Sequence, residues 1–359
     1  MVWRAARAMT LKEFRQLRRD HRLVAMLLFQ PILLLLVFGY AASFDVTEVE
    51  AAVYGPGAEQ TTGRLPEAIT AAVVDPGGDR GDAEELLRGG GVTLAILTDQ
   101  QPPLVLLDGS QLFAARSVVT ALAQAPVQME QEVLFNPDLE TPPVLVPALA
   151  GLVLVFVGTI ATSLGVVRER QTGTIEQLAV MPFRPFDVLA GKTLPYLLVG
   201  IVDLGLVMAV AVGIFDVPFA GSVPLFLTGS LLFLVVALGM GLLVSTVSEN
   251  QGQAMQLSLM VALPQVLLSG AIFPVESMAV GIRWIAYILP LTYFVEVARG
   301  VMLRAAGWSD LLLPLTALAG HPDAVFGLSI ARVRRDLVPA RMPAADGGVA
   351  GPSPEGAAA

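Results

Sequence analysis

The stretch VLVPALAGLVLVFVGTIATSLGVV, residues 144–167, contains no charged side chain, and the segment RERQTGTIEQL follows it directly at residues 168–178. An uncharged apolar run of this length is long enough to cross the hydrocarbon core of a bilayer as a single helix. The arginines that follow mark the point where the chain leaves the membrane, because basic residues gather beside the cytoplasmic ends of spans. The stretch therefore predicts an integral membrane protein.

Comparable apolar runs recur along the chain, which is 55% hydrophobic and only 15% charged. Soluble domains are about 25% charged, so much of this apolar surface needs a lipid environment. The predicted fold class is an α-helical polytopic membrane protein. Its six transmembrane helices are expected at residues 23–44, 144–167, 190–214, 224–247, 255–273 and 310–331.

Three further segments have their own patterns. Residues 1–22 place apolar and basic side chains on different sides of a helix, which predicts an amphipathic interfacial helix; an ordinary basic flank is the alternative. Residues 274–309 are broken by prolines into short apolar pieces, which predicts re-entrant or extracytoplasmic helices. Residues 332–359 combine a basic start with a Pro/Gly/Ala-rich end, so we expect a disordered tail.

The segment 45–143 differs from the rest in composition. It has 16 acidic residues, 4 arginines and no lysine. Strand-like runs at 49–54, 92–97 and 104–107 alternate with helix-like segments at 82–88 and 114–124, separated by Gly/Pro turns. This pattern predicts a small extracytoplasmic α/β domain between the first two spans.

The distribution of basic residues predicts the orientation of the chain. With the N-terminus inside, 15 of the 22 Lys and Arg residues fall in cytoplasmic segments. Basic residues in short segments beside the spans stay on the cytoplasmic side. We therefore expect a multi-pass protein whose N-terminus and C-terminus are both cytoplasmic.

No catalytic or metal site is predicted. Gly191-Lys192-Thr193 resembles the end of a phosphate-binding loop, but Phe186 stands where that loop needs its first glycine, and the segment opens a membrane helix. The chain has two histidines and no cysteine, so a metal site is not predicted. The net charge of −9 argues against nucleic acid as a partner. The chain is therefore not expected to be an enzyme or to bind a cofactor.

Polar side chains inside the expected spans are few: Asp203, His321 and Asp323. Asp203 is either a carboxylate of the substrate path or a helix–helix hydrogen-bond partner, and in both cases it should face the bundle interior. The sequence His321-Pro322-Asp323 interrupts the last span, where an unbroken apolar run is expected. We interpret it as a local peculiarity that kinks or weakens the helix, with an export gate as the alternative.

The loop 168–189 is far longer than the few residues that a connection between two spans requires. A glycine breaks the preceding span, and residues 174–180 form a short amphipathic turn. This shape suits the docking of a cytoplasmic partner; a helix lying on the membrane surface is the alternative.

Five segments together resemble ABC-2-type transporter permeases, in the multidrug-efflux-like branch with an outer domain. The first is Arg168-Glu169-Arg170 with Gly173-Thr174-Ile175-Glu176-Gln177-Leu178. The others lie at 268–274 (LSGAIFP), at 290–293 (PLTY) with Arg299-Gly300, at 108–110 (DGS) and at 135–139 (FNPDL). The resemblance covers residues 5–337 in the right order, and Ala279 departs from it where a proline is usual.

The resemblance implies a permease subunit of an ATP-driven exporter of amphipathic, drug-like or lipid-like molecules in the bacterial plasma (inner) membrane. A separate cytoplasmic ABC ATPase would bind ATP and Mg, and a second permease subunit and membrane lipids would complete the assembly. The residues implied in ATPase coupling are Arg168, Glu169, Gly173, Thr174, Glu176 and Leu178. Those implied in the re-entrant region are Ser269, Gly270, Pro274, Pro290 and Arg299. The competing hypothesis is a membrane-anchored receptor or assembly scaffold with a ligand-binding outer domain.

Overall fold

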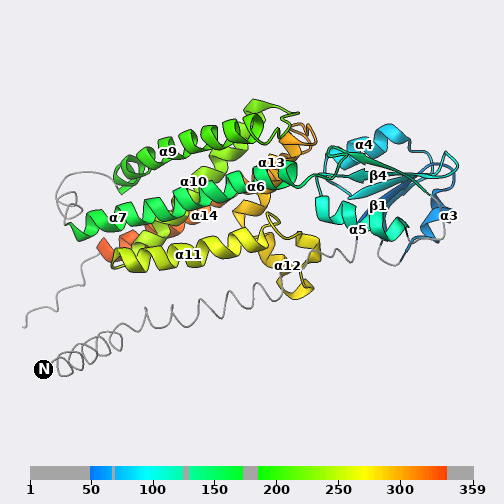
Figure 1. Ribbon diagram of the computed structural model, residues 1–359. Helices are drawn as coiled ribbons and strands as arrows, with labels where there is room; N and C mark the ends of the chain where they lie inside the picture. Colours follow the sequence, from blue (N-terminus) through cyan, green and yellow to red (C-terminus); the bar gives the residue numbers. More distant parts are fainter. Residues whose placement is uncertain (1–48, 67–68, 124–128, 173–184, 338–359) are drawn as a thin grey trace, which may run out of the picture.

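The chain forms two parts that lie end to end, a sheet domain and a helical bundle (Figure 1). The structure, a computed structural model, describes residues 49–66, 69–123, 129–172 and 185–337. The expected interfacial helix at 1–22, the expected first span at 23–44 and the end of the tail lie outside the described residues.

The sheet domain contains five strands in the order β2-β1-β3-β4-β5. β1 is parallel to both β2 and β3, β3 is antiparallel to β4, and β4 is parallel to β5. The strands are β1 Val49–Tyr54, β2 Ile69–Asp75, β3 Leu94–Leu97, β4 Leu104–Asp108 and β5 Glu130–Leu134. The helices are α3 Ala58–Thr62, α4 Arg80–Arg88 and α5 Leu112–Ala123. Parallel neighbours need crossover connections, which these helices provide.

Helices cover both faces of the sheet. Alternate side chains of the strands point to opposite faces, so each strand contributes to two cores. On one face Ala114 and Val118 of α5 pack against Val53 and Ile96. On the other face Leu87 of α4 packs against residues that include Ala95 and Leu106. The strands are apolar on both sides because both sides are buried.

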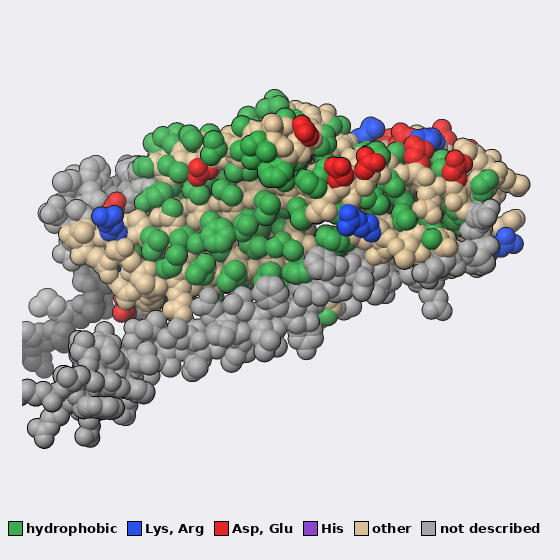
Figure 2. Space-filling model, viewed as in Figure 1, with side chains coloured by type: hydrophobic (Ala, Val, Ile, Leu, Met, Phe, Trp, Pro, Cys, Tyr) green, Lys and Arg blue, Asp and Glu red, His purple; other side chains and the backbone are tan. Residues whose placement is uncertain are grey.

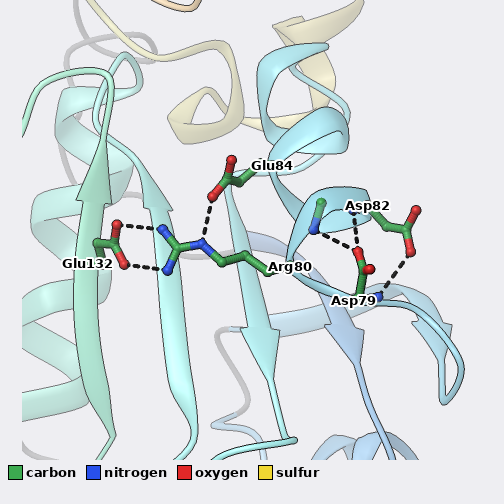
Figure 3. A network of polar contacts seen from close by, with 6 residues as sticks. Asp79, Arg80, Asp82, Glu84 and Glu132 are labelled. Carbon is green, nitrogen blue, oxygen red and sulfur yellow. Dashed lines mark hydrogen bonds and ion pairs between the residues drawn. The ribbon is translucent and has the colours of Figure 1, made fainter.

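A polar network fixes α4 against the edge strand β5 (Figure 3). The Arg80 guanidinium donates to both carboxylate oxygens of Glu132 at 2.7 and 3.0 Å, and to Glu84 at 2.7 Å. Asp79 caps the helix by accepting from the N–H groups of Gly81 and Asp82. The cap satisfies backbone donors that a helix start leaves free.

The bundle begins with one continuous helix from Thr141 to Gln171, made of α6 Thr141–Val155, the π-helical segment η1 Phe156–Ala161 and α7 Thr162–Gln171. It continues with α9 Pro185–Gly213, α10 Val223–Val247 and α11 Gln251–Leu268. Among the described residues, three helices are long and apolar enough to cross a membrane: Thr141–Gln171, Thr193–Gly213 and Val223–Val247.

Helix α10 is the centre of the bundle and contacts every other long helix among the described residues. A Cβ on Gly241 would lie 2.6 Å from the carbonyl oxygen of Gly158, so the absence of a side chain lets α10 and η1 approach closely. Small residues serve this purpose where helices pack in lipid. The Phe233 ring of α10 stacks on Phe294, with centroids 4.8 Å apart.

After α11 the chain turns back through η2 Val275–Ser277 and α12 Val280–Ala286, then through α13 Pro290–Met302 into α14 Leu312–Leu337. The expected span 255–273 is wrong at its end: α11 stops at Leu268, because Gly270 has φ +82° and Pro274 follows. The last span is not interrupted at Pro322. α14 runs without a break past Pro322 and six residues beyond the expected end at 331.

Other boundaries shift by a few residues. α7 extends to Gln171 and α9 begins at Pro185, so helical turns occupy both ends of the expected loop 168–189. Proline suits the first turn of a helix, which explains the early start of α9.

The surfaces of the sheet domain and the bundle differ in composition. Apolar side chains cover the visible face of the bundle, and most of the visible charged side chains lie on the sheet domain (Figure 2).

Candidate functional site

The sheet domain meets the bundle where several of the resemblance segments converge, and we call this region the junction. The 108–110 segment ends β4, and the 135–139 segment links β5 to α6. Gly109 N donates to Leu134 O at 3.0 Å, and Asn136 Nδ2 donates to Gly109 O at 3.3 Å. Asn136 also donates to Glu140 O and accepts from Glu140 N. The buried Asn136 side chain therefore connects the sheet to the start of α6.

An ion pair that the sequence did not suggest crosses the junction. Arg304 follows the end of α13, and its Nη1 lies 3.6 Å from Asp108 Oδ2. The side chain of Asp108 is 0% exposed and that of Arg304 only 5%. Asp108 Oδ1 accepts from Ser110 N at 2.8 Å. The pair therefore places opposite charges from the two parts of the chain in one dry contact.

Burial raises the pKa of the Asp108 carboxyl above its ordinary value. The Arg304 charge and the hydrogen bonds from Ser110 and Arg304 act in the opposite direction and only partly offset that rise. Transfer of a charge out of water is costly unless it is paired. Among these influences the Arg304 charge lowers the pKa of Asp108 most, and burial outweighs it.

Arg299 ties three segments of the junction together. Its Nε donates to Val144 O in α6 at 3.2 Å, and its Nη2 donates to Ala271 O, just after α11, at 3.0 Å. Leu303 adds an apolar contact with Leu112 and Val144. These contacts hold α13 against the first turns of α5 and α6.

The residues expected in the re-entrant region surround the same place. Ser269 caps the end of α11, and its Oγ accepts from Ala271 N. Gly270 provides the left-handed turn, Pro274 precedes η2, and Pro290 opens α13. A cavity of about 330 Å³ separates this turn from the sheet domain, and Ser269, Gly270, Pro274 and Arg299 line it.

The three polar residues expected inside the spans do not converge. His321 contacts the re-entrant segment: its Nε2 lies 3.1 Å from Ile288 O, and its ring centroid is 5.8 Å from that of Tyr293. Asp323, two residues further along α14, is exposed. Asp203 is half-buried on α9, a helix that is mostly exposed in this single chain. The structure therefore does not place the Asp203 side chain fully inside the bundle.

The opposite end of the bundle carries the start of the expected coupling segment. Arg168 and Glu169 are exposed in the last turn of α7. Arg170 donates to Ser248 O at 3.3 Å, and Gln171 accepts from Gln251 at 3.0 Å, so α7 is fastened to the turn between α10 and α11. Gly173, Thr174, Glu176 and Leu178 lie outside the described residues.

Arg304 was missed by sequence reasoning because a single arginine after an apolar helix is typical of a membrane-interface anchor. Only the fold brings it to Asp108, which the resemblance had already singled out. In the part of the chain that the structure describes, no group of three or more His, Asp and Glu side chains is arranged to hold a metal ion.

The model of the family described as "ABC-2 family transporter protein" matches residues 21–331. In Escherichia coli (strain K12), "Probable multidrug ABC transporter permease YbhS" is 29% identical over 94% of this chain and 98% of that protein. "Probable multidrug ABC transporter permease YbhR" is 29% identical over 86% of this chain and 94% of that protein. "Inner membrane transport permease YhhJ" is 32% identical over 59% of this chain and 57% of that protein.

These matches extend over the sheet domain and the bundle alike. The mostly helical fold with its apolar candidate spans agrees with a polytopic membrane protein, and the matching family is one of transporter permeases. The chain therefore belongs to the ABC-2 family of transporter proteins, as a permease subunit of an ABC transporter.

Proposed function

We propose that this chain is the membrane-spanning subunit of an ATP-driven exporter of amphipathic small molecules, drug-like or lipid-like, in a bacterial inner membrane. Family membership implies an ABC ATPase as partner and a pairing of permease subunits. In the proposal the ATPase is a separate cytoplasmic chain that binds ATP and Mg. The similarity to two probable multidrug permeases of Escherichia coli supports multidrug transport as the activity to test first.

The observation that carries the proposal is the continuous helix Thr141–Gln171. Its first turn belongs to the junction, where Val144 O accepts from Arg299. Its last turn carries the exposed Arg168 and Glu169 and leads into residues 173–184. A partner that docks on the 168–182 loop would therefore pull directly on the element that reaches the junction, which is rigid-body transmission.

The arrangement of the spans is part of the same proposal. We infer six spans, with the sheet domain outside the membrane and both termini in the cytoplasm. Three apolar helices and the basic residues at the end of α7 support this orientation. In this arrangement the junction and its cavity face the outer leaflet, at the exit of the transport path.

The test is ATP-dependent transport of a fluorescent amphipathic dye in inverted vesicles that contain the permease with its ATPase. Glu169→Arg should reduce transport at least about tenfold while the permease stays in the membrane, because a docking contact of one charged residue carries on the order of 1–3 kcal/mol. The control is Glu85→Arg, an equally exposed acid in the sheet domain, which should leave transport unchanged. Full transport and full ATPase assembly with Glu169→Arg would show that the loop does not dock the partner.

A further inference from the structure

The junction cavity is bounded by both parts of the chain. Its wall includes Ser110 and Phe113 from the sheet domain and Val295, Arg299 and Arg304 from the bundle. Its volume of about 330 Å³ falls at the lower end of the range for small-molecule sites, roughly 300–1,000 Å³. The cavity can therefore hold a polar head group together with a short apolar portion.

Arg304 lines this wall, and two of its buried hydrogen-bond donors are unused. Its side chain is 5% exposed, and its Nε and Nη2 have no hydrogen-bond partner among the described residues. A buried guanidinium with free donors is costly, since each unsatisfied buried donor carries a desolvation penalty. A group with two neighbouring acceptor oxygens fits the fork of a guanidinium best, and carboxylates and phosphates both offer such a pair.

Two guanidinium groups, rather than a net positive charge, offer a place for an acidic group. The charged side chains that line the cavity are Arg299, Arg304 and Glu296, and the Asp108 carboxylate behind the wall offsets part of the Arg304 charge. Asp108 is fully buried and is not part of the wall, because it contacts Arg304 through Nη1. The nitrogens Nε and Nη2 thus remain for a ligand while Nη1 stays with Asp108.

The N-terminal end of helix α5 adds positive electrostatic potential at the cavity. The first residues of α5, Leu112, Phe113 and Ala114, line the cavity, and α5 is 12 residues long. The N-terminal end of a helix carries a partial positive charge that stabilises a nearby anion. Apolar side chains of Val144 and Leu313 complete the wall and suit the hydrocarbon part of an amphipathic molecule.

We propose that the junction cavity binds the acidic group of an amphipathic molecule, a carboxylate or phosphate held by the free donors of Arg304. The inference deepens the proposed export function by naming a substrate class, and it rests on that function for its place on the exit path. The same chemistry is offered by a free amphipathic acid and by the head group of an acidic lipid. The experiment separates these two sources.

The probes are octanoate, octan-1-ol and octylammonium, which share a tail and differ in the head group. Their binding to the full-length permease in phosphatidylcholine nanodiscs is measured by equilibrium dialysis, with empty nanodiscs as background. No ATP and no ATPase are needed, so a failure of the export proposal leaves this measurement intact. Octanoate should bind at least about tenfold more tightly than either other probe, because only it pairs with the guanidinium.

Two matched variants isolate the arginine. Arg304→Gln alone would leave Asp108 buried without its counter-charge and endanger the fold. The comparison therefore uses Asp108→Asn against Asp108→Asn/Arg304→Gln, which differ only at the guanidinium. Octanoate should bind Asp108→Asn as tightly as the unmodified chain or more tightly, and the double variant at least about tenfold more weakly. Arg88→Gln, an exposed arginine at the end of α4, should change nothing.

Each outcome either identifies the source of the acidic group or contradicts the proposal. Displacement of octanoate by added phosphatidylglycerol, only where Arg304 is present, would identify a lipid head group as the source; no displacement would identify a free amphipathic acid. Equal binding of octan-1-ol and octanoate, undiminished octanoate binding by the double variant, or no octanoate binding at all would overturn the proposal. The last result would mean that the cavity holds water only.

Discussion

The sheet domain and the bundle are both rich in apolar residues, but they place them differently. In the sheet domain almost all large apolar side chains lie inside, on the two faces of the sheet, and Val74 at 41% is the main exception among the described residues. On α9 of the bundle, large apolar side chains such as Val202 (69%) and Leu206 (65%) lie outside. The same kind of residue thus indicates water around one part and lipid around the other.

The largest effect is expected where the two parts meet. Arg304→Gln should destabilise the chain by about 3–5 kcal/mol, because it leaves the Asp108 carboxylate buried and unpaired. Removal of both charges in Asp108→Asn/Arg304→Gln should recover most of that loss. Thermal unfolding of the detergent-solubilised protein checks both values. A double variant that is as unstable as the sum of Asp108→Asn and Arg304→Gln would show that the pair is not coupled.

The next-largest effect tests whether the exposed apolar residues of α9 face lipid. Val202→Lys should hinder membrane insertion by about 2.5–3.5 kcal/mol, because it places a charge at the middle of a lipid-facing helix. Val74→Lys, on an exposed site of the sheet domain, should change stability by no more than about 0.5 kcal/mol. The membrane-inserted fraction after extraction with carbonate is the measurement. If both variants insert equally well, α9 does not face lipid.

Close packing within the bundle gives a smaller effect. Gly241→Ala should destabilise the chain by about 1–3 kcal/mol, because its Cβ would lie 2.6 Å from a backbone oxygen of the neighbouring helix. Gly205→Ala on α9 meets nothing within 4 Å and should be neutral or slightly stabilising. The difference between the two midpoints of thermal unfolding tests which face of each helix is packed.

The smallest effect belongs to the surface of the sheet domain. Arg80→Ala removes an exposed network with Glu84 and Glu132 and should cost no more than about 1 kcal/mol. The loss should shrink as salt is added, because exposed charges are screened. Unfolding midpoints at low and high ionic strength provide the check. An effect that is large and independent of salt would mean that this network is less exposed than the structure shows.

Local patterns were enough to predict much of the sheet domain. The run at 49–54 forms β1, and the runs at 92–97 and 104–107 overlap β3 and β4. β2 and β5 were missed. β5, with two glutamates in five residues, is half-exposed at the edge of the sheet, and its pairing with β4 and the Arg80 contact decide its structure. Edge strands depend on such long-range partners, which a sequence window does not contain.

The candidate site, like the sheet domain, was predicted only where local sequence patterns were sufficient. The segments that form the junction were identified one by one, but nothing in the sequence indicates that Asp108 and Arg304 touch. That contact depends on how the sheet domain sits on α13, which is a property of the whole fold. The histidine at 321 gains a partner in the same way, since Ile288 belongs to a distant turn. The ATPase-coupling role stays a prediction for Arg168 and Glu169 as well as for the residues past Thr172.

The continuous helix Thr141–Gln171 has a mechanical consequence. At a rise of about 1.5 Å per residue it is about 46 Å long, which exceeds the hydrocarbon thickness of about 30 Å. In the proposed orientation its two ends would lie in different compartments, and the helix would act as a lever. A rotation of about 15°, as in the allosteric rigid-body step of haemoglobin, would displace one end by about 12 Å relative to the other. A small tilt at the arginine end would then become a large displacement beside the cavity.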